Sequence, residues 1–308
     1  FTNISSIIFP TSLRIISDNA FYNLQSLKQI QIPPQNSMLM SIGSSAFAGT
    51  GLFSLILSSS KLTFIGQSAF ANNINLEYVI GMDNMIILNL GQNTFQDCTA
   101  LTSVILPPYL TTIDTFQFQG CKKLKTISLP DKINEIGINA FHGCESLTQI
   151  TYQGAGQYVD GPGIPLISIA TGAFTNCYAL NNFVIPPQVT TISSNAFINC
   201  TSLANVTYSC TSSSTSDNTI LQIATSAFYN TPYSMIYRMP TPGQKTCRNI
   251  QYVLSASDIE NNALLIAPGV TDIVSPNSVC NNNNNLLDTV FIPATVSSLS
   301  SGLFAKCQ

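Results

Sequence analysis

Charged residues are scarce in this sequence, and their scarcity narrows the classes of partner it could bind. Only 8% of the 308 residues are Asp, Glu, Lys or Arg, whereas about 25% is usual for a soluble domain. With a net charge of -3, the chain has no basic stripe that could neutralise phosphates. We therefore expect no nucleic-acid partner, and a surface covered by uncharged polar side chains.

Long apolar runs are also missing. No run approaches the roughly 18 residues that a membrane-spanning helix needs. The N-terminus has no charged flank followed by an apolar signal core. We expect no membrane span within this segment.

The residue types needed for catalysis are sparse as well. His142 is the only histidine, and no Gly-x-Ser-x-Gly motif or similar arrangement supplies a nucleophile for it to activate. The carboxylates are scattered, so no acid and base pair is visible, and there is no C-x-x-C spacing to suggest a metal. We expect no enzyme activity, no metal and no cofactor, and interpret His142 as a structural residue.

What the sequence does contain is an internal repeat of 23 residues. Counting from Phe118, the repeated positions are Cys121, Leu124, Ile127, Leu129, Pro130, Ile133, Ile136 and Ala140, and Phe141 begins the next cycle. The phenylalanine that opens each repeat, called the landmark Phe below, recurs as Phe21, Phe47, Phe70, Phe95, Phe118, Phe141, Phe174, Phe197, Phe228 and Phe304. Such a period indicates a solenoid in which each coil contacts only its neighbours. Residues 1–308 are thus expected to form one domain of about eleven or twelve coils.

The spacing within a repeat predicts the structure of each coil. Ile127 and Leu129 alternate with Thr126 and Ser128, as in a half-buried strand. Pro130 ends this strand because proline has no N–H to donate. The return path is expected to make a short turn or one-turn helix before the next landmark Phe. One strand per coil predicts one parallel sheet.

The unit Phe-x-x-Cys-x-x-Leu-x-x-Ile-x-Leu-Pro, followed by Ile-x-x-x-Ala-Phe, resembles the BspA-type (Treponema-type) leucine-rich repeat. The resemblance covers nearly the whole chain, although residues 241–285 lack the Ala-Phe pair and are degenerate. It implies a leucine-rich-repeat solenoid, a right-handed superhelix of the α/β horseshoe type with short turns or one-turn helices on its convex side. It also implies a secreted or cell-surface protein of a microbe or parasite that adheres to a host protein.

The sequence begins and ends within the repeat pattern. It begins at Phe1 inside a repeat and stops at Gln308, one residue after a repeated position. We therefore expect a piece of a longer protein, with any signal, anchor or tail outside it.

Six of the nine cysteines occupy one slot, three residues after the landmark Phe: Cys98, Cys121, Cys144, Cys177, Cys200 and Cys307. Other coils place Leu24, Thr50, Asn73 or Thr231 in this slot. We interpret the slot as a small interior packing site and expect its thiols to stay reduced, because a free cysteine behaves as a small hydrophobe.

Three coils lengthen just past their strands, at residues 153–164, 209–219 and 241–249. Insertions at one phase of a solenoid emerge along one rim. Cys210 and Cys247 lie in two of these loops, on neighbouring coils, and are predicted to form a disulfide. Cys280 has no predicted partner.

Three asparagines, Asn3, Asn199 and Asn205, begin Asn-x-Ser/Thr triplets and are candidate glycosylation sites. Such triplets also arise by chance in a chain rich in Asn and Thr.

Outward strand positions are expected to form two columns on the concave face. The candidate ligand-binding residues on this face are Gln29, Gln31, Ile56, Tyr78, Ile80, Ser103 and Ile105. The apolar ones fall on three consecutive coils about 5 Å apart, and contiguous apolar surface usually marks a protein contact site. The alternative is that these residues are present for β-propensity alone.

Two function classes stay open. The first is an extracellular adhesion module that binds a host extracellular-matrix or cell-surface protein. The second is a structural module that self-associates into dimers or filaments, through the same apolar patch or through an uncapped end of the solenoid.

Overall fold

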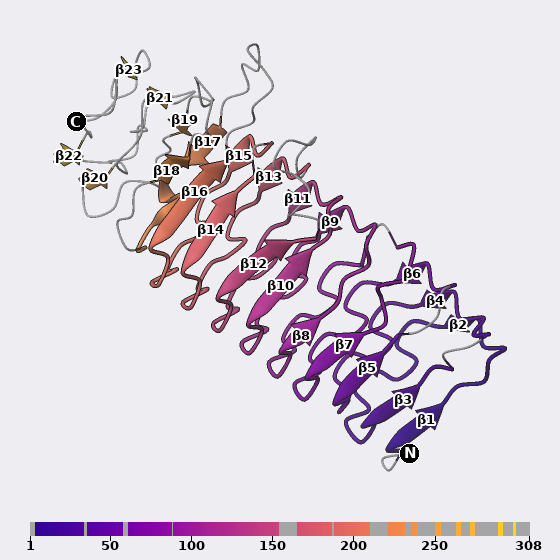
Figure 1. Cartoon of the computed structure of the whole chain (residues 1–308). Coiled ribbons are helices and arrows are strands. Elements are labelled where there is room, and N and C mark those ends of the chain that lie inside the picture. The colour runs from indigo at the N-terminus through magenta and orange to yellow at the C-terminus, as the bar shows by residue number, and fades with distance from the viewer. Residues whose placement is uncertain are drawn as a thin grey trace, which may run out of the picture.

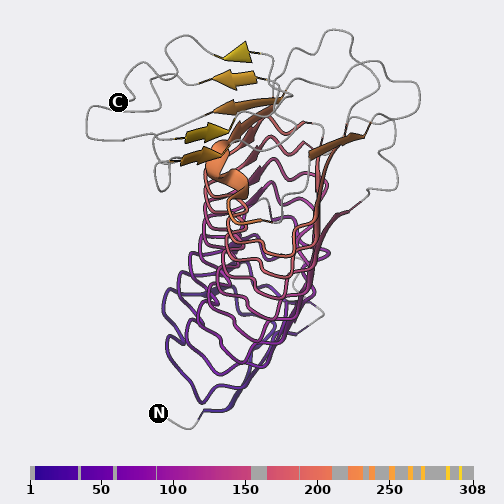
Figure 2. The ribbon, with the colours of Figure 1, turned by 90° about the vertical axis from the view of Figure 1, so that its left-hand side faces the viewer.

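The computed structural model describes residues 4–33, 36–57, 61–87, 89–153, 165–186, 188–209, 221–231, 236–239, 250–253, 263–265, 272–274, 289–291 and 298–299. Over these residues the chain winds into a solenoid of stacked coils, and every strand pair is parallel (Figures 1 and 2). The predicted fold is confirmed.

Helix is nearly absent, as expected. Within the described ranges the only helix is the single 3-10 turn η2 (Thr225–Phe228), and no helix there has the length and hydrophobicity to cross a bilayer. The rim insertions and most of residues 241–285 lie outside the described residues. The total number of coils therefore stays a prediction.

One row of strands, which we call the leading face, is formed by the Leu and Ile residues that recur at the same spacing in each repeat. Its residues alternate between solvent and core: Ile127 is buried, whereas Thr126 and Ser128 on either side are exposed. The strands of this face are β1 (Ser6–Ile8), β3 (Gln29–Gln31), β5 (Ser54–Ile56), β7 (Tyr78–Ile80), β8 (Ser103–Val104), β10 (Thr126–Leu129), β12 (Gln149–Tyr152), β14 (Asn182–Ile185), β16 (Asn205–Ser209) and β18 (Ile236–Met239). Two further strands, β20 (Ala263–Leu265) and β22 (Thr289–Phe291), pair with each other.

A second row of strands, the return face, lies on the opposite side of the coils (Figure 1). It comprises β2 (Ile15–Ile16), β4 (Ser41–Ile42), β6 (Phe64–Ile65), β9 (Thr112–Ile113), β11 (Glu135–Ile136), β13 (Ser168–Ile169), β15 (Thr191–Ile192), β17 (Leu221–Ala224), β19 (Ile250–Val253), β21 (Asp272–Val274) and β23 (Ser298–Leu299). The first three form one sheet, and β9 to β23 form an eight-stranded sheet.

The expectation of a single sheet was wrong, because the return path also pairs from coil to coil. Every return strand before β17 has only two residues, one exposed or half-buried and one buried, as in Glu135 and Ile136 of β11. Two residues are too few to show an alternating pattern in the sequence.

Each coil closes through a bend around its landmark Phe, where a turn or a one-turn helix was expected. In the bend around Phe141, Asn139 and Gly143 adopt the left-handed conformation, with φ of 52° and 71°, which Asn and Gly tolerate best. The bends are also hydrogen-bonded between coils: the Phe118 N–H donates to the Ala140 carbonyl at 2.8 Å. Pairing thus continues around the coil.

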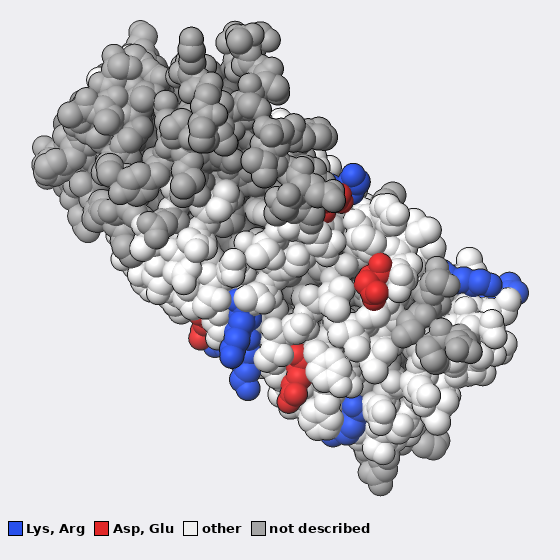
Figure 3. Space-filling model, in the orientation of Figure 1, with Lys and Arg blue, Asp and Glu red and all other residues white. Residues whose placement is uncertain are grey.

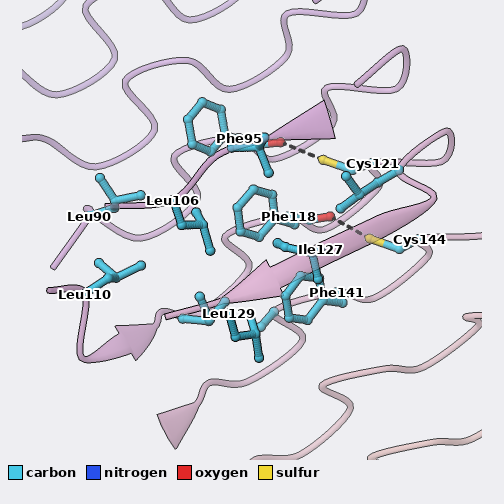
Figure 4. Close-up of a cluster of buried hydrophobic side chains, with 14 of the residues drawn as sticks. Leu90, Phe95, Leu106, Leu110, Phe118, Cys121, Ile127, Leu129, Phe141 and Cys144 are labelled. Carbon is cyan, nitrogen blue, oxygen red and sulfur yellow. Dashed lines mark hydrogen bonds between the residues drawn. The ribbon is translucent and has the colours of Figure 1, made fainter. Parts of the chain in front are cut away.

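From Phe21 to Phe228 the landmark Phe side chains form a continuous column through the core. Phe118 stacks on Phe95 and on Phe141, with ring centroids 5.6 and 5.4 Å apart and the rings nearly parallel (Figure 4). Phe141 in turn stacks on Phe174 at 5.2 Å. All four are fully buried. Each ring therefore takes most of its packing from the two adjacent coils.

The cysteine slot is more specific than a packing site. Cys144 Sγ donates to the main-chain carbonyl of Phe118, the landmark Phe of the preceding coil, at 3.1 Å (Figure 4). Cys98, Cys121, Cys177 and Cys200 make the same contact at 3.1–3.2 Å. All five described thiols are buried and free, as predicted.

Asn73 and Thr50 explain the other residues in the slot. The Asn73 Nδ2 donates to the carbonyls of Phe47 and Phe70 at 2.9 and 2.8 Å, and the Thr50 hydroxyl donates to Asn73 Oδ1. Among the described slot residues, only Leu24 therefore lacks a side-chain donor, and the Thr231 hydroxyl donates to the carbonyl of Phe228 in its own coil at 2.7 Å.

Candidate functional site

The leading face brings the predicted binding residues together. These residues lie on four consecutive coils, and their side chains point away from the core. The exposed ones are Gln29, Gln31, Ile56, Tyr78, Ser103 and Ile105, and Ile80 is half-buried. The exposed fractions of Ile56, Tyr78 and Ile105 are 45%, 40% and 42%.

The strand register makes three isoleucines direct neighbours. Ile56 of β5 pairs with Ile80 of β7. The Ile105 N–H donates to the Val79 carbonyl at 3.1 Å, which places Ile105 beside Ile80 at the end of β8. Tyr78 stands one column away, between Ser54 and Ser103.

Phe53 is a member of this cluster that the sequence reasoning missed. It directly precedes β5, and its side chain is 50% exposed. The Lys28 Nζ lies 5.5 Å from the centre of the Phe53 ring, a geometry that favours a cation over an aromatic face. The residue just before each leading strand from β1 to β16 forms a third outward column, next to the two columns expected from the sequence. We call Phe53, Ile56, Tyr78, Ile80 and Ile105 the leading-face patch.

Beyond this patch the leading face becomes polar. The outward residues of β10 and β12 are Thr126, Ser128, Gln149 and Thr151, all exposed. In the view of Figure 3 the described surface is mostly uncharged, with isolated acidic and basic side chains. Apolar contacts and hydrogen bonds, more than ion pairs, are therefore what this surface offers a partner.

His142 lies at a bend, away from the leading-face patch in the sequence and in the fold. Its Nε2 is 3.3 Å from the Asn176 Nδ2, and partial burial lowers the pKa of the imidazole. Among the described residues no group of three or more His, Cys, Asp or Glu side chains is arranged to hold a metal.

Of the candidate modification sites, only the side chain of Asn199 is among the described residues. The Asn199 Nδ2 donates to Asn176 Oδ1 at 2.8 Å, and its Oδ1 accepts from Asn230 at 2.8 Å. A glycan on the Asn199 nitrogen would disturb this chain of amides. Asn205 lies in β16, and its side chain is outside what is described, as are Asn3, Cys210 and Cys247. Glycosylation and the disulfide stay predictions.

Comparison with known proteins gives a family and several similar folds. A search of curated proteins finds no match. A leucine-rich repeat protein from Bacteroides ovatus is 18% identical, with 96% of this chain and 74% of that chain covered and a TM-score of 0.49. The T. pallidum leucine-rich repeat protein is 22% identical, with 58% and 79% covered and a TM-score of 0.47. The pneumococcal vaccine antigen PcpA is 16% identical, with 82% and 74% covered and a TM-score of 0.35.

The family assignment comes from the sequence itself. The model of the BspA type leucine rich repeat region matches residues 1–89, 88–233 and 167–308, in six copies. These ranges extend over the whole chain, including the degenerate stretch 241–285. The chain belongs to the BspA-type leucine-rich-repeat family.

Proposed function

We propose that this chain is a non-catalytic, protein-binding module of the cell surface, and that it adheres to a host extracellular-matrix or cell-surface protein. The leading-face patch is the observation that carries the proposal. It exposes two aromatic and three aliphatic side chains on consecutive coils, and aromatic residues are enriched where protein interfaces derive most of their energy. Membership of the BspA-type family, with its surface proteins, supports the location.

The alternative explanation of the patch, β-propensity, is weaker for one of its members, Phe53, because Tyr78 is an aromatic residue within β7 and fits propensity as well. Propensity accounts for Ile56, Ile80 and Ile105, which are β-branched. It does not account for Phe53, which lies outside the strand and still holds an exposed aromatic ring beside Lys28.

The test is a binding screen against purified extracellular-matrix proteins on a sensor surface. The patch variant is Ile56→Ser/Tyr78→Ser/Ile105→Ser. Val184→Ser is the matched control, because Val184 is 52% exposed on β14 of the same face but lies outside the patch. We expect the wild-type chain to bind at least one matrix protein, the patch variant to bind at least about tenfold more weakly, and the control to bind normally. Equal binding by all three chains would contradict the assignment of the patch.

A second candidate function is self-association through the same patch or through an uncapped end of the solenoid. Light scattering of the wild-type chain and of the patch variant over a range of concentrations separates the two. Self-association through the patch gives the wild-type chain a larger molar mass than the patch variant, whereas an adhesion module gives the two chains equal molar masses at each concentration.

The predicted Cys210–Cys247 disulfide bears on the location, because disulfides persist mainly in oxidising compartments. We expect a non-reduced, alkylated digest to show these two cysteines linked and the slot cysteines alkylated only after unfolding. Alkylation of both Cys210 and Cys247 in the native protein would weaken the extracellular assignment.

A further inference from the structure

A second apolar cluster lies on the return face, on the side of the coils opposite the leading-face patch. Ile15, Met40 and Phe64 occupy three consecutive coils, with exposed fractions of 63%, 49% and 54%. The register pairs Ile15 with Ser41 and Ser41 with Phe64, and Met40 directly precedes Ser41. We call these three residues the return-face patch.

The return-face patch coincides with one structural unit. It belongs to the three-stranded sheet β2-β4-β6, which is not hydrogen-bonded to the eight-stranded sheet that follows. At the position of Ile15 and Phe64, the eight-stranded sheet carries Thr112, Glu135 and Ser168. The fold therefore does not require an apolar residue at this position, and burial in the core does not explain the patch, because all three side chains face solvent.

We propose that the return-face patch joins two copies of this chain in an antiparallel dimer with two-fold symmetry. The pattern of the patch is self-complementary. The two-fold axis lies between the two copies and runs parallel to β4, the strand of the middle coil. Rotation about it leaves each residue at the same height along the strand direction and places the first coil of one copy opposite the third coil of the other. Ile15 then faces Phe64 of the second copy, and Met40 faces Met40 of the second copy. All three apolar side chains meet apolar side chains.

The charged neighbours of the return-face patch are compatible with this arrangement. The register places Arg14 level with Thr63, and Asp18 level with Gln67. In the antiparallel dimer Arg14 faces Thr63 and Asp18 faces Gln67, so no like charges oppose each other. A two-fold axis along the solenoid would instead reverse the strands, and Met40 would face away from its counterpart.

The dimer would leave both leading faces pointing outward. Two copies joined back to back present two leading-face patches, and a second attachment raises avidity without any new contact. This consequence rests on the proposed function, whereas the dimer does not. Because interfaces with few apolar side chains fall at the weak end of the range, we expect dimerisation to depend on concentration.

Engineered cysteines test the geometry under mild oxidation. Met40→Cys is expected to form covalent dimers by itself, because the two copies of residue 40 face each other. Ile15→Cys and Phe64→Cys are expected to crosslink only when mixed. The wild-type chain is the control for the native cysteines, and five of these are buried. Crosslinking of Ile15→Cys alone as fast as in the mixture, or no crosslinking by any variant, would overturn the proposal.

Sedimentation velocity over a concentration series tests whether the dimer forms in the unmodified chain. Phe64→Ser should abolish the concentration-dependent increase in sedimentation coefficient. Phe53→Ser should retain it, since Phe53 is a similarly exposed phenylalanine on the leading face, and the melting temperatures of both variants check folding. A wild-type chain that stays monomeric throughout, or a dimer lost in Phe53→Ser but kept in Phe64→Ser, would refute the return-face dimer. A wild-type chain that dimerises but binds no matrix protein would count against the proposed function alone.

Discussion

The coils before residue 91 and those between residues 91 and 203 share the same interior packing. They differ in their outward residues and in the residue that fills the slot after the landmark Phe. Both keep the stacked landmark Phe, and from Thr50 onward both place a hydrogen-bond donor in the slot that follows it. The first group fills the slot with Leu24, Thr50 and Asn73, and it carries the return-face patch and all of the leading-face patch except Ile105. The second group fills it with cysteine and has mostly polar outward residues. The repeat thus constrains the buried positions that pack between neighbouring coils, whereas the outward positions vary from coil to coil.

The largest expected effect tests the shared interior. Phe141→Ala should lower the free energy of unfolding by roughly 3 to 5 kcal/mol, as for a buried large-to-small change, because Phe141 is fully buried and stacked on both sides. Phe21→Ala should cost clearly less, since Phe21 is half-buried near the N-terminal end of the described solenoid. Chemical denaturation of both variants measures the difference. A cost below about 1 kcal/mol for Phe141→Ala would mean that the landmark Phe is not part of the core.

The next effect concerns the donor slot, where the two groups of coils use different chemistry. Cys144→Ala should cost about 1–3 kcal/mol, because it removes one donor from a buried carbonyl. Asn73→Ala should cost more, because Asn73 serves two carbonyls and accepts from Thr50. Cys144→Ser keeps a donor and is the control. Equal unfolding free energies for Cys144→Ala and Cys144→Ser would show that the slot needs volume and not a donor.

A smaller effect should distinguish the two groups by pH. Burial raises the pKa of the Cys98 thiol from 9.0 to about 12, and also raises the pKa of Cys121, Cys144 and Cys177. In the unfolded chain these thiols ionise near pH 9, so the unfolded state binds fewer protons above that pH. Stability is therefore retained below pH 9 and lost as the pH rises towards 12.

Hydrogen exchange between pH 8 and 10.5, corrected for the intrinsic rates, locates this loss. Amides of the cysteine-containing coils, residues 95–203, should lose protection as the pH rises, whereas coils 39–76 should change little. A uniform loss over both regions would point to another titrating group.

Much of this fold could be predicted from the sequence because its physical cause is repeated. Ile127 and Leu129 alternate with polar residues in coil after coil, so the leading strands and the Phe column could be placed. The two-residue strands of the return face show no such pattern, and the return-face patch there was missed with them. Phe53 was missed because it stands outside the strand. The donor role of Cys144 could not be predicted, because its acceptor is a main-chain carbonyl of another coil and leaves no signal in the sequence. The only hint was that the same slot accepts Cys, Asn and Thr.

Under the proposed function, the first coils carry the surface that binds a protein partner. The direct measurement is hydrogen-exchange mass spectrometry of the chain with and without whichever extracellular-matrix protein the screen retains. We predict protection at the leading strands of residues 29–31, 54–56, 78–80 and 103–105, with little change at residues 126–129 and 182–185. Protection confined to the later coils, or spread evenly along the solenoid, would contradict the claim.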